Sequence, residues 1–309
     1  MNNTTMRLRF YFFFIFFGVL FLFYPGDSYY VNLFAFNRTL FTAADKQVSP
    51  DKPAVIVPIL RTPNYPAVSA QGVYVVDLPS FTPFFEKNSH ERFLTASITK
   101  IMTALVVEDT LSPEKIVTIQ QPQTNGQIMG LNEGERITVE NLLYGMLVYS
   151  GNDAAYALAE VNGYDNFVNL MNKKTESLHM TESHFTNPAG FDDVDNYSSP
   201  YDLTLAAREL LKNDLLAKMV STKEITIQDV DAKYTHKLEN VNRLLGEIPG
   251  LRGLKTGSTE LAGENLVSFY KTERHAFLIV VLKSSDRFGD TTAIINWINQ
   301  NVDYLTVKT

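Results

Sequence analysis

The 309-residue sequence contains no cysteine, which excludes disulfide bonds, thiolate nucleophiles and cysteine-ligated metal centres. It also lacks any long run of one charge sign: charged residues make up 20% of the chain and the net charge is -7. A nucleic-acid-binding protein normally has a clustered basic face, so we expect no nucleic-acid partner. The five histidines are scattered without the spacing of a helical metal site. We therefore expect no metal and no other cofactor.

The N-terminus carries a signal for export. Arg7 and Arg9 precede an apolar run from Phe10 to Tyr24, in which eight residues are phenylalanine. A positive flank followed by about 15 apolar residues is typical of a signal sequence or a short membrane anchor. The run is short for a membrane span, which needs roughly 17 to 25 residues. We expect residues 1–30 to direct export and to tether the chain to the cell membrane, with the remainder extracytoplasmic; removal of the segment by cleavage stays open.

The rest of the chain reads as a stalk followed by one domain of the α+β class. Residues 31–66 are proline-rich and weakly patterned, as in a linker, and residues 67–309 hold the periodic segments. Helical spacing of apolar residues predicts helices, and alternation between turn residues predicts strands. The expected strands are 72–78, 251–257, 265–271 and 276–282, and the expected helices are 97–107, 138–149, 154–160, 164–178, 203–211 and 291–301. This order indicates an antiparallel sheet flanked by helices, with a separate helical lobe.

A serine and a lysine at the start of one predicted helix suggest nucleophilic catalysis. Ser97 and Lys100 are three residues apart, so both side chains lie on one face of the helix. A serine hydroxyl needs a base to remove its proton, and a lysine can be that base only when its pKa is strongly lowered. Burial and a nearby cation both lower a lysine pKa. The same spacing recurs at Ser112 and Lys115, so the pair alone is a weak signal.

Two further motifs follow in the sequence and strengthen the interpretation. Ser150-Gly151-Asn152 interrupts two predicted helices, so a hydroxyl and an amide project from a turn. Lys255-Thr256-Gly257 lies on a predicted strand, where the glycine lets a substrate backbone approach closely. Together with Ser97 and Lys100, these motifs predict an acyl-transfer enzyme in which Ser97 is the nucleophile.

The three motifs resemble those of a known family. The sequence is similar to the serine-type D-Ala-D-Ala carboxypeptidases, the low-molecular-weight penicillin-binding proteins of peptidase family S11 in the penicillin-recognising superfamily. The similarity extends to the segments ASITKIMTALV, YSGNDAA, HFTNPAGF and LKTGSTELAGENLV and covers residues 72–301. It implies a fold like that of β-lactamases and DD-peptidases, removal of the terminal D-Ala from peptidoglycan stem peptides, and inhibition by β-lactams.

The resemblance also implies a role for each motif residue. Ser97 would attack the carbonyl of the penultimate D-Ala, and Lys100 would accept its proton. Ser150 would relay a proton to the leaving amine, and Asn152 would bind the substrate amide. Lys255 would keep Lys100 neutral through cation repulsion.

The remaining implied residues bind substrate. The backbone N–H groups of Ser97 and Ser258 would form the oxyanion hole. Thr256 and Thr259 lie where the family binds the terminal carboxylate, Gly257 completes the strand motif, and Arg287 would assist at the carboxylate.

Three other activities share this chemistry. A D,D-endopeptidase or transpeptidase would form the same acyl-enzyme on the same substrates. A class A β-lactamase needs a glutamate for deacylation, and the one E-x-x-x-N match between Ser150 and Lys255 is Glu209 to Asn213, inside a predicted helix. A penicillin-binding sensor would become acylated but would turn over poorly.

Overall fold

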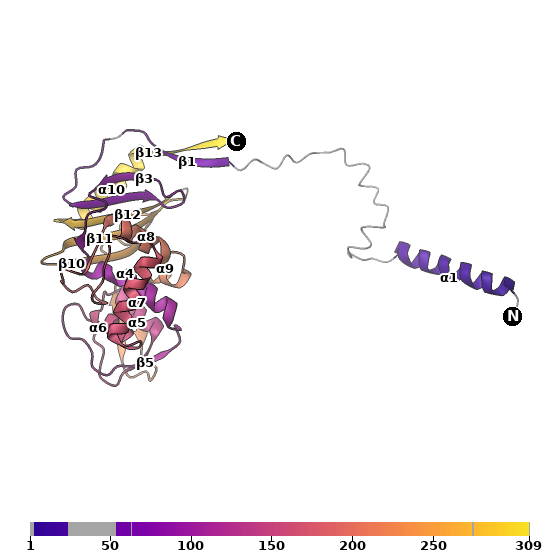
Figure 1. Cartoon of the computed structure of the whole chain (residues 1–309), viewed down its shortest axis with the longest axis horizontal. Helices are drawn as coiled ribbons and strands as arrows, with labels where there is room; N and C mark the ends of the chain where they lie inside the picture. The colour runs from indigo at the N-terminus through magenta and orange to yellow at the C-terminus, as the bar shows by residue number, and fades with distance from the viewer. Residues whose placement is uncertain (1–2, 24–53, 63, 274, 309) are drawn as a thin grey trace. The chain divides into compact units, whose positions relative to one another are not determined.

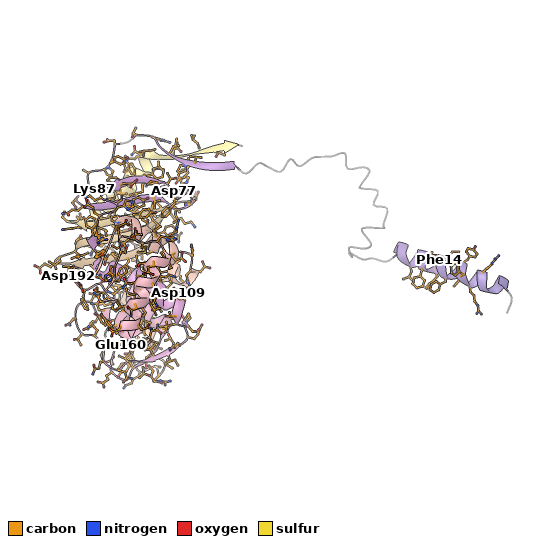
Figure 2. The ribbon with its side chains drawn as sticks, in the orientation of Figure 1. Phe14, Asp77, Lys87, Asp109, Glu160 and Asp192 are labelled. Carbon is orange, nitrogen blue, oxygen red and sulfur yellow. The ribbon has the colours of Figure 1, made fainter. Side chains whose placement is uncertain are left out.

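The computed structural model describes residues 3–23, 54–62, 64–273 and 275–308, which fall into two units. One unit comprises residues 1–55 and 307–309, and the other comprises residues 56–306. The first contains helix α1 (Asn3–Phe23), in which the aromatic side chains between Phe10 and Phe17, such as Phe14, are exposed (Figure 2). Within the described residues, we find no helix that is both long enough and apolar enough to cross a membrane. Tyr24, the end of the expected apolar run, and residues 31–53 of the expected stalk lie outside the described residues.

The second unit is built on one antiparallel sheet of five strands in the order β10-β11-β12-β2-β3 (Figure 1). The strands are β2 (Gly72–Asp77), β3 (Pro83–Lys87), β10 (Leu251–Thr259), β11 (Gly263–Lys271) and β12 (Ala276–Ser284). The predicted strand at 72–78 and the predicted C-terminal meander are confirmed. Strand β3 was not predicted, because only two of its five residues are buried and it begins with proline. β10 forms one edge of the sheet, next to the proposed catalytic residues.

Each face of this sheet has its own hydrophobic core. Val73 and Val75 pack in one cluster and Tyr74 and Val76 in the other, as the period of two in a strand requires. Two helices cover these faces: α10 (Arg287–Asn301) and α8 (Pro200–Leu210). Ile294 and Ile298 of α10 belong to the first cluster, while α8 contributes to the second (Figure 1). The sheet is therefore buried on both sides.

The helices on the α8 side form a lobe around one buried helix. They are the 3-10 turn η1 (Ala96–Thr99), α4 (Lys100–Thr110), α5 (Val139–Leu147), α6 (Asn152–Glu160), α7 (Tyr164–Ser177) and α9 (Asp214–Val220). The first eight residues of α4 are all buried, so this helix forms the centre of the lobe. Thr138 caps α5 by accepting a hydrogen bond from the N–H of Asn141. The sheet with its separate helical lobe confirms the α+β class.

Four two-stranded ladders complete the fold, and none of them was predicted. They are β1 (Ala54–Leu60) with β13 (Val302–Lys308), β4 (Phe93–Leu94) with β7 (Tyr197–Ser198), β5 (Ile116–Thr118) with β6 (Arg136–Thr138), and β8 (Glu224–Gln228) with β9 (Thr235–Glu239). β1 lies within the segment expected to be an irregular stalk. The structure has a strand there because the apolar stretch AVIVPIL finds a pairing partner 240 or more residues away, which local pattern cannot reveal.

We predict that Asp290 stabilises the sheet end near α10. Its buried carboxylate accepts hydrogen bonds from the N–H and hydroxyl of Ser69, the N–H of Ala70 and the hydroxyl of Ser284. Burial raises the pKa of Asp290, but these hydrogen bonds outweigh it and lower the pKa below the usual 3.8. Replacing Asp290 with alanine should therefore lower the free energy of unfolding by roughly 3 kcal/mol in urea titrations near pH 7.

The pH dependence gives the control for this prediction. A carboxyl with a lowered pKa stabilises the fold above its unfolded pKa and loses that effect as pH falls through its folded pKa. The difference between wild type and Asp290→Ala should therefore shrink below about pH 4. Asp231→Ala removes an exposed ion pair with Arg136 and should cost less than about 1 kcal/mol. Equal losses in the two variants would contradict the role of Asp290.

Candidate active site

Ser97 lies in η1 with a partly exposed side chain, immediately before the buried helix α4. The residue before it, Ala96, has φ of +47°, a left-handed conformation that alanine rarely adopts. The hydroxyl oxygen of Ser97 is 2.8 Å from the Nζ atom of Lys100. The predicted nucleophile and base are therefore within hydrogen-bond distance of one another.

Lys100 is completely buried, which is rare for a lysine. Its Nζ atom contacts three acceptors: Ser97 Oγ, the Oδ1 of Asn152 at 2.8 Å and the backbone oxygen of Ala189 at 2.7 Å. Burial lowers the pKa of Lys100 well below 10.5, and the cation of Lys255 lowers it further, while Asp153 opposes both. We expected cation repulsion by Lys255 to act on Lys100. The structure adds that burial has the larger effect.

The second wall of the site is the turn between α5 and α6. Ser150 occupies it with φ of +66°, another left-handed conformation. Its hydroxyl oxygen is 2.8 Å from the Nζ atom of Lys255. Asn152 is the first residue of α6, and its Nδ2 donates to the backbone oxygen of Asn125 at 3.0 Å. Because its Oδ1 contacts Lys100, Asn152 links the base to the 125–131 loop.

The third wall is the edge strand β10. Lys255 is 1% exposed. Burial is the main cause that lowers its pKa to about 7, and the guanidinium of Arg287 contributes. Two hydrogen-bonded pairs, Ser97 with Lys100 and Ser150 with Lys255, thus face each other across the site.

Gly257 allows β10 to approach η1. A Cβ atom on this residue would lie 2.9 Å from the N atom of Ser97 and 2.9 Å from the backbone oxygen of Thr95, closer than real Cβ atoms come to backbone. We predicted that this glycine would make room for a substrate backbone; the structure shows that it makes room for η1. The contact places the N–H of Ser97 next to β10, where the resemblance implies the oxyanion hole with Ser258.

Two of the expected carboxylate-binding residues already have protein partners. The hydroxyl of Thr259 donates to Asp192 at 2.5 Å and accepts from the N–H of Ala262 at 3.1 Å, and Asp192 lies at the rim of the unit (Figure 2). Arg287 Nη1 donates to the backbone oxygen of Gly257 at 2.7 Å. Arg287 is therefore fixed against the same strand as Lys255, and its guanidinium adds positive charge to this part of β10.

Sequence reasoning missed the residues that hold these walls in position. The carboxylate of Asp153 accepts hydrogen bonds from the N–H groups of Met129, Gly130 and Leu131, and so fixes the loop that contacts Asn152. The Oδ1 of Asn187 accepts hydrogen bonds from three N–H groups of residues 189–191, next to the Ala189 oxygen that contacts Lys100. Asp153 directly follows the S-G-N motif, and Asn187 lies inside HFTNPAGF. These two positions were the only sign in the sequence that could have pointed to them.

The second S-x-x-K sequence has no such surroundings. Ser112 and Lys115 are both exposed, and the Ser112 hydroxyl donates to Glu114. Among the described residues, no group of three or more His, Asp or Glu side chains is arranged to hold a metal ion. The constellation of Ser97, Lys100, Ser150 and Lys255 is therefore the candidate active site.

Comparison with known proteins decides the family. The family model described as D-alanyl-D-alanine carboxypeptidase, Peptidase_S11, matches residues 60–286. The chain belongs to this family. This confirms the identification made from the sequence motifs, and the DD-peptidase fold of related structures confirms the fold class.

Curated family members are about a third identical to this chain over the regions that align. DacF of Bacillus subtilis is 35% identical over 229 residues, which cover 71% of this chain and 58% of that protein. DacD of Escherichia coli is 29% identical over 290 residues, covering 87% and 70%. The D-alanyl-D-alanine carboxypeptidase of Streptomyces sp. K15 is 32% identical over 255 residues, covering 75% and 88%. The matched region thus spans little more than half of the Bacillus protein.

Solved structures of the family superpose closely. The Streptomyces K15 DD-transpeptidase has a TM-score of 0.70 at 32% identity, covering 76% of this chain and 98% of its own. A penicillin-binding protein homologue from Mycobacterium tuberculosis has a TM-score of 0.72 at 27% identity, covering 77% and 94%.

We predict that Lys255→Met moves the acid limb of the pH–rate profile for penicillin acylation. Removing the cation raises the pKa of Lys100, so the base becomes neutral only at higher pH. Stopped-flow acylation rates should show the limb displaced upward by on the order of one pH unit. Lys237→Met, at an exposed position of β9, is the control and should leave the limb in place. A lower rate at every pH with an unmoved limb would contradict this role for Lys255.

Proposed function

We propose that this chain is a serine D-alanyl-D-alanine carboxypeptidase that removes the terminal D-Ala from peptidoglycan stem peptides. The observation that carries the proposal is the fully buried amine of Lys100, 2.8 Å from the Ser97 hydroxyl. A lysine with a strongly lowered pKa at that distance is suited to take the serine proton. Membership of the carboxypeptidase family supports the same reaction.

The proposed acylation begins at Ser97. Its Oγ attacks the carbonyl carbon of the penultimate D-Ala while its proton passes to Nζ of Lys100. The N–H groups of Ser97 and Ser258 stabilise the oxyanion that forms. When the C–N bond breaks, Ser150, in contact with Lys255, relays a proton to the leaving amine, and free D-Ala departs. Water then hydrolyses the ester, which restores Ser97.

Binding in the proposed complex follows the charges of the site. The substrate's terminal carboxylate is drawn to the guanidinium of Arg287, which lies against the part of β10 that carries Lys255 and Thr256. Because the Thr259 hydroxyl already contacts Asp192, carboxylate binding by Thr259 requires that contact to break. Asn152 presents its side-chain amide to the substrate peptide. β-Lactams are proposed to acylate Ser97 in the same way.

Transpeptidation is the second candidate, and one observation favours it. Matches from Streptomyces strain K15 carry both names: the curated sequence is named a D-alanyl-D-alanine carboxypeptidase and the solved structure a DD-transpeptidase. The β-lactamase alternative receives no support from Glu209, which lies on α8 and forms an ion pair with Lys212 just beyond the end of that helix. A carboxypeptidase, a transpeptidase, a β-lactamase and a penicillin sensor all share the acylation step. They differ in how fast the ester is released and in what attacks it.

We also propose that residues 1–30 direct export and hold the chain at the outer surface of the bacterial cell membrane, with residues 67–309 as the extracytoplasmic catalytic domain. Two features support this. Arg7 and Arg9 precede the apolar run, and in α1 the side chains from Phe10 to Phe17 are roughly half or more exposed, where a membrane interface would cover them.

A diacyl-Lys-D-Ala-D-Ala peptide tests the proposed activity. We expect the wild-type chain to release D-Ala without cross-linked product, because water is the acceptor. Ser97→Ala should lose activity by at least about 1,000-fold, while Ser112→Ala, the matched serine, should behave as wild type. Chromatography of all peptide products with added amine acceptor checks this. Cross-linked peptide as the main product would replace the proposal with transpeptidation, and activity retained by Ser97→Ala would overturn it.

The membrane proposal is tested by flotation with anionic phospholipid vesicles. The full chain should float with the vesicles, and a chain that begins at residue 31 should stay in the soluble fraction, because it lacks the apolar run and its two arginines. If both chains behave alike, residues 1–30 do not form the membrane tether.

A further inference from the structure

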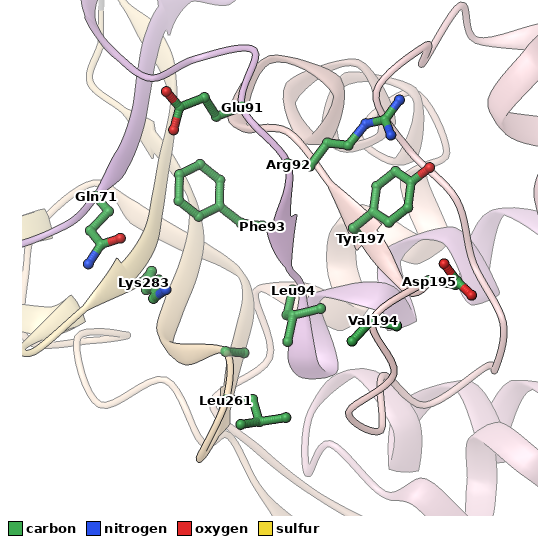
Figure 3. A pocket seen from close by; sticks show the side chains of 11 residues that line it. Gln71, Glu91, Arg92, Phe93, Leu94, Val194, Asp195, Tyr197, Leu261 and Lys283 are labelled. Carbon is green, nitrogen blue, oxygen red and sulfur yellow. The ribbon is translucent and has the colours of Figure 1, made fainter.

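Titratable side chains outside the catalytic residues lie in two kinds of surroundings. A groove beside β4 is lined by four charged residues that are all exposed: Glu91, Arg92, Asp195 and Lys283 (Figure 3). Exposed charges stay hydrated and need no protein partner. Glu135 and His236 are instead buried, with 1% and 7% of their surface exposed. A buried carboxylate is costly unless it is hydrogen-bonded, so the contacts of this pair show what it holds together.

Both carboxylate oxygens of Glu135 have partners. Oε1 lies 2.7 Å from Nε2 of His236. Oε2 accepts hydrogen bonds from the backbone N–H of Asn132 at 3.0 Å and from the side-chain amide of the same residue at 3.3 Å. Glu135 directly precedes β6, and its backbone oxygen accepts a hydrogen bond from the N–H of Ile119 at 2.9 Å. The carboxylate therefore closes the turn between the 125–131 loop and β6.

His236 lies on β9 and joins this turn to the 125–131 loop. Its Nδ1 is 3.3 Å from the backbone oxygen of Met129, while its Nε2 contacts Glu135. The N–H of Met129 donates to the carboxylate of Asp153 at 2.9 Å. Both backbone polar groups of Met129 are therefore held, one by the residue that follows the S-G-N motif and the other by His236.

The same loop holds Asn152 through two further hydrogen bonds. The backbone N–H of Asn152 donates to the oxygen of Gln127 at 2.7 Å, and its Nδ2 donates to the oxygen of Asn125 at 3.0 Å. The remaining side-chain atom, Oδ1, is 2.8 Å from Nζ of Lys100. The position of the loop therefore sets the position of the Asn152 amide next to the proposed base.

The β8–β9 hairpin can hold the loop because it is itself bound to the helical lobe. The N–H of Val230 in the hairpin turn donates to the oxygen of Arg136 at 2.7 Å, and the side-chain amide of Asn141 on α5 donates to the oxygen of Gln228 at 2.9 Å. The loop also packs on α5 directly, since a Cβ atom on Gly145 would lie 2.2 Å from the sulfur of Met129. The loop thus contacts both α5 and β9.

We propose that Glu135 and His236 are positioning residues for Asn152: the buried pair holds the 125–131 loop where Asn152 reaches Lys100 and the substrate amide. The inference rests on the proposed function, in which Asn152 acts during acylation of Ser97. Neither member of the pair touches the reacting atoms, so the pair acts only through the loop. Its effect can still be large, because a displacement of about 1 Å caused far from the chemistry can lower a rate by about 100-fold.

Two substitutions of His236 and one control test this proposal. His236→Leu keeps an apolar side chain at the site but loses both ring nitrogens. His236→Gln restores an amide with two donors, enough for Glu135 and the Met129 oxygen. Lys237→Leu introduces leucine at the exposed neighbouring position of β9. The rate constant for acylation of Ser97 by a labelled penicillin should fall by roughly tenfold in His236→Leu and stay within about twofold of wild type in the other two variants.

An Asn152→Ala background separates positioning from a general loss of structure. Asn152 is the first residue of α6, where alanine is compatible with the helix. If His236 acts through the Asn152 amide, His236→Leu should lower the acylation rate by less than about twofold once that amide is absent. An equal loss in both backgrounds would contradict the proposal. Should His236→Leu not fold, His236→Asn, whose amide is too short to reach both oxygens, takes its place with the same expectations.

Hydrogen exchange gives a second readout that does not need this background. In the disrupted variant, the N–H groups of Asn152 and of residues 129–131 should exchange faster than in wild type. The N–H groups of β11, inside the sheet, should stay protected, because loss of the pair opens the loop locally. Faster exchange throughout the chain would show a general structural role and would overturn the assignment.

The outcomes separate this inference from the proposed function. If wild type is acylated at Ser97 and releases D-Ala, but the disrupted variant is acylated at the wild-type rate, the pair has no positioning role and the proposed function stands. If wild type neither forms a penicillin ester on Ser97 nor releases D-Ala, the proposed function itself fails.

Discussion

The contact between the buried amine of Lys100 and the hydroxyl of Ser97 is the constraint on which the site depends. An amine without solvent must be neutral or surrounded by acceptors, and three segments supply these: Ser97 from η1, Asn152 from α6 and the Ala189 oxygen from the segment before β7. Burial of the amine thus requires the helical lobe to close around it. The same closure lowers the pKa of Lys100, as its proposed role as a base requires.

Close backbone approach assembles the other half of the site. β10 reaches η1 because Gly257 has no side chain, and Gly190 has the same function on the opposite side, where a Cβ atom would overlap the oxygen of Ala96. Ala96 and Ser150 both have positive φ angles, which cost about 1–3 kcal/mol each when they are held in place. The packed α4 helix and sheet maintain these conformations. One of them directly precedes Ser97, and the other is Ser150 itself. The site is therefore held by the fold rather than by its own local preferences.

Much of this arrangement follows from sequence pattern, and the exceptions have physical causes. The helices around α4 and the meander of β10, β11 and β12 are long and periodic, so their type could be predicted. β1, β13 and the β8–β9 hairpin are short or weakly alternating and depend on partners distant in sequence. In the site, Ser97, Lys100, Ser150 and Lys255 were found because they belong to the three motifs that resemble those of the family. Asp153 and Asn187 were missed because they act only by holding backbone N–H groups, which no spacing rule reveals.

The central claim, that Lys100 is neutral in the folded enzyme, can be measured directly. The ¹⁵N NMR signal of its Nζ atom, assigned by comparison with Lys100→Arg, can be followed through a pH titration of the intact chain. Our account predicts that this amine is unprotonated at pH 8, far below the usual lysine pKa of about 10.4. An amine that stays protonated until pH 10 would contradict the account, because Lys100 could then not accept the proton of Ser97.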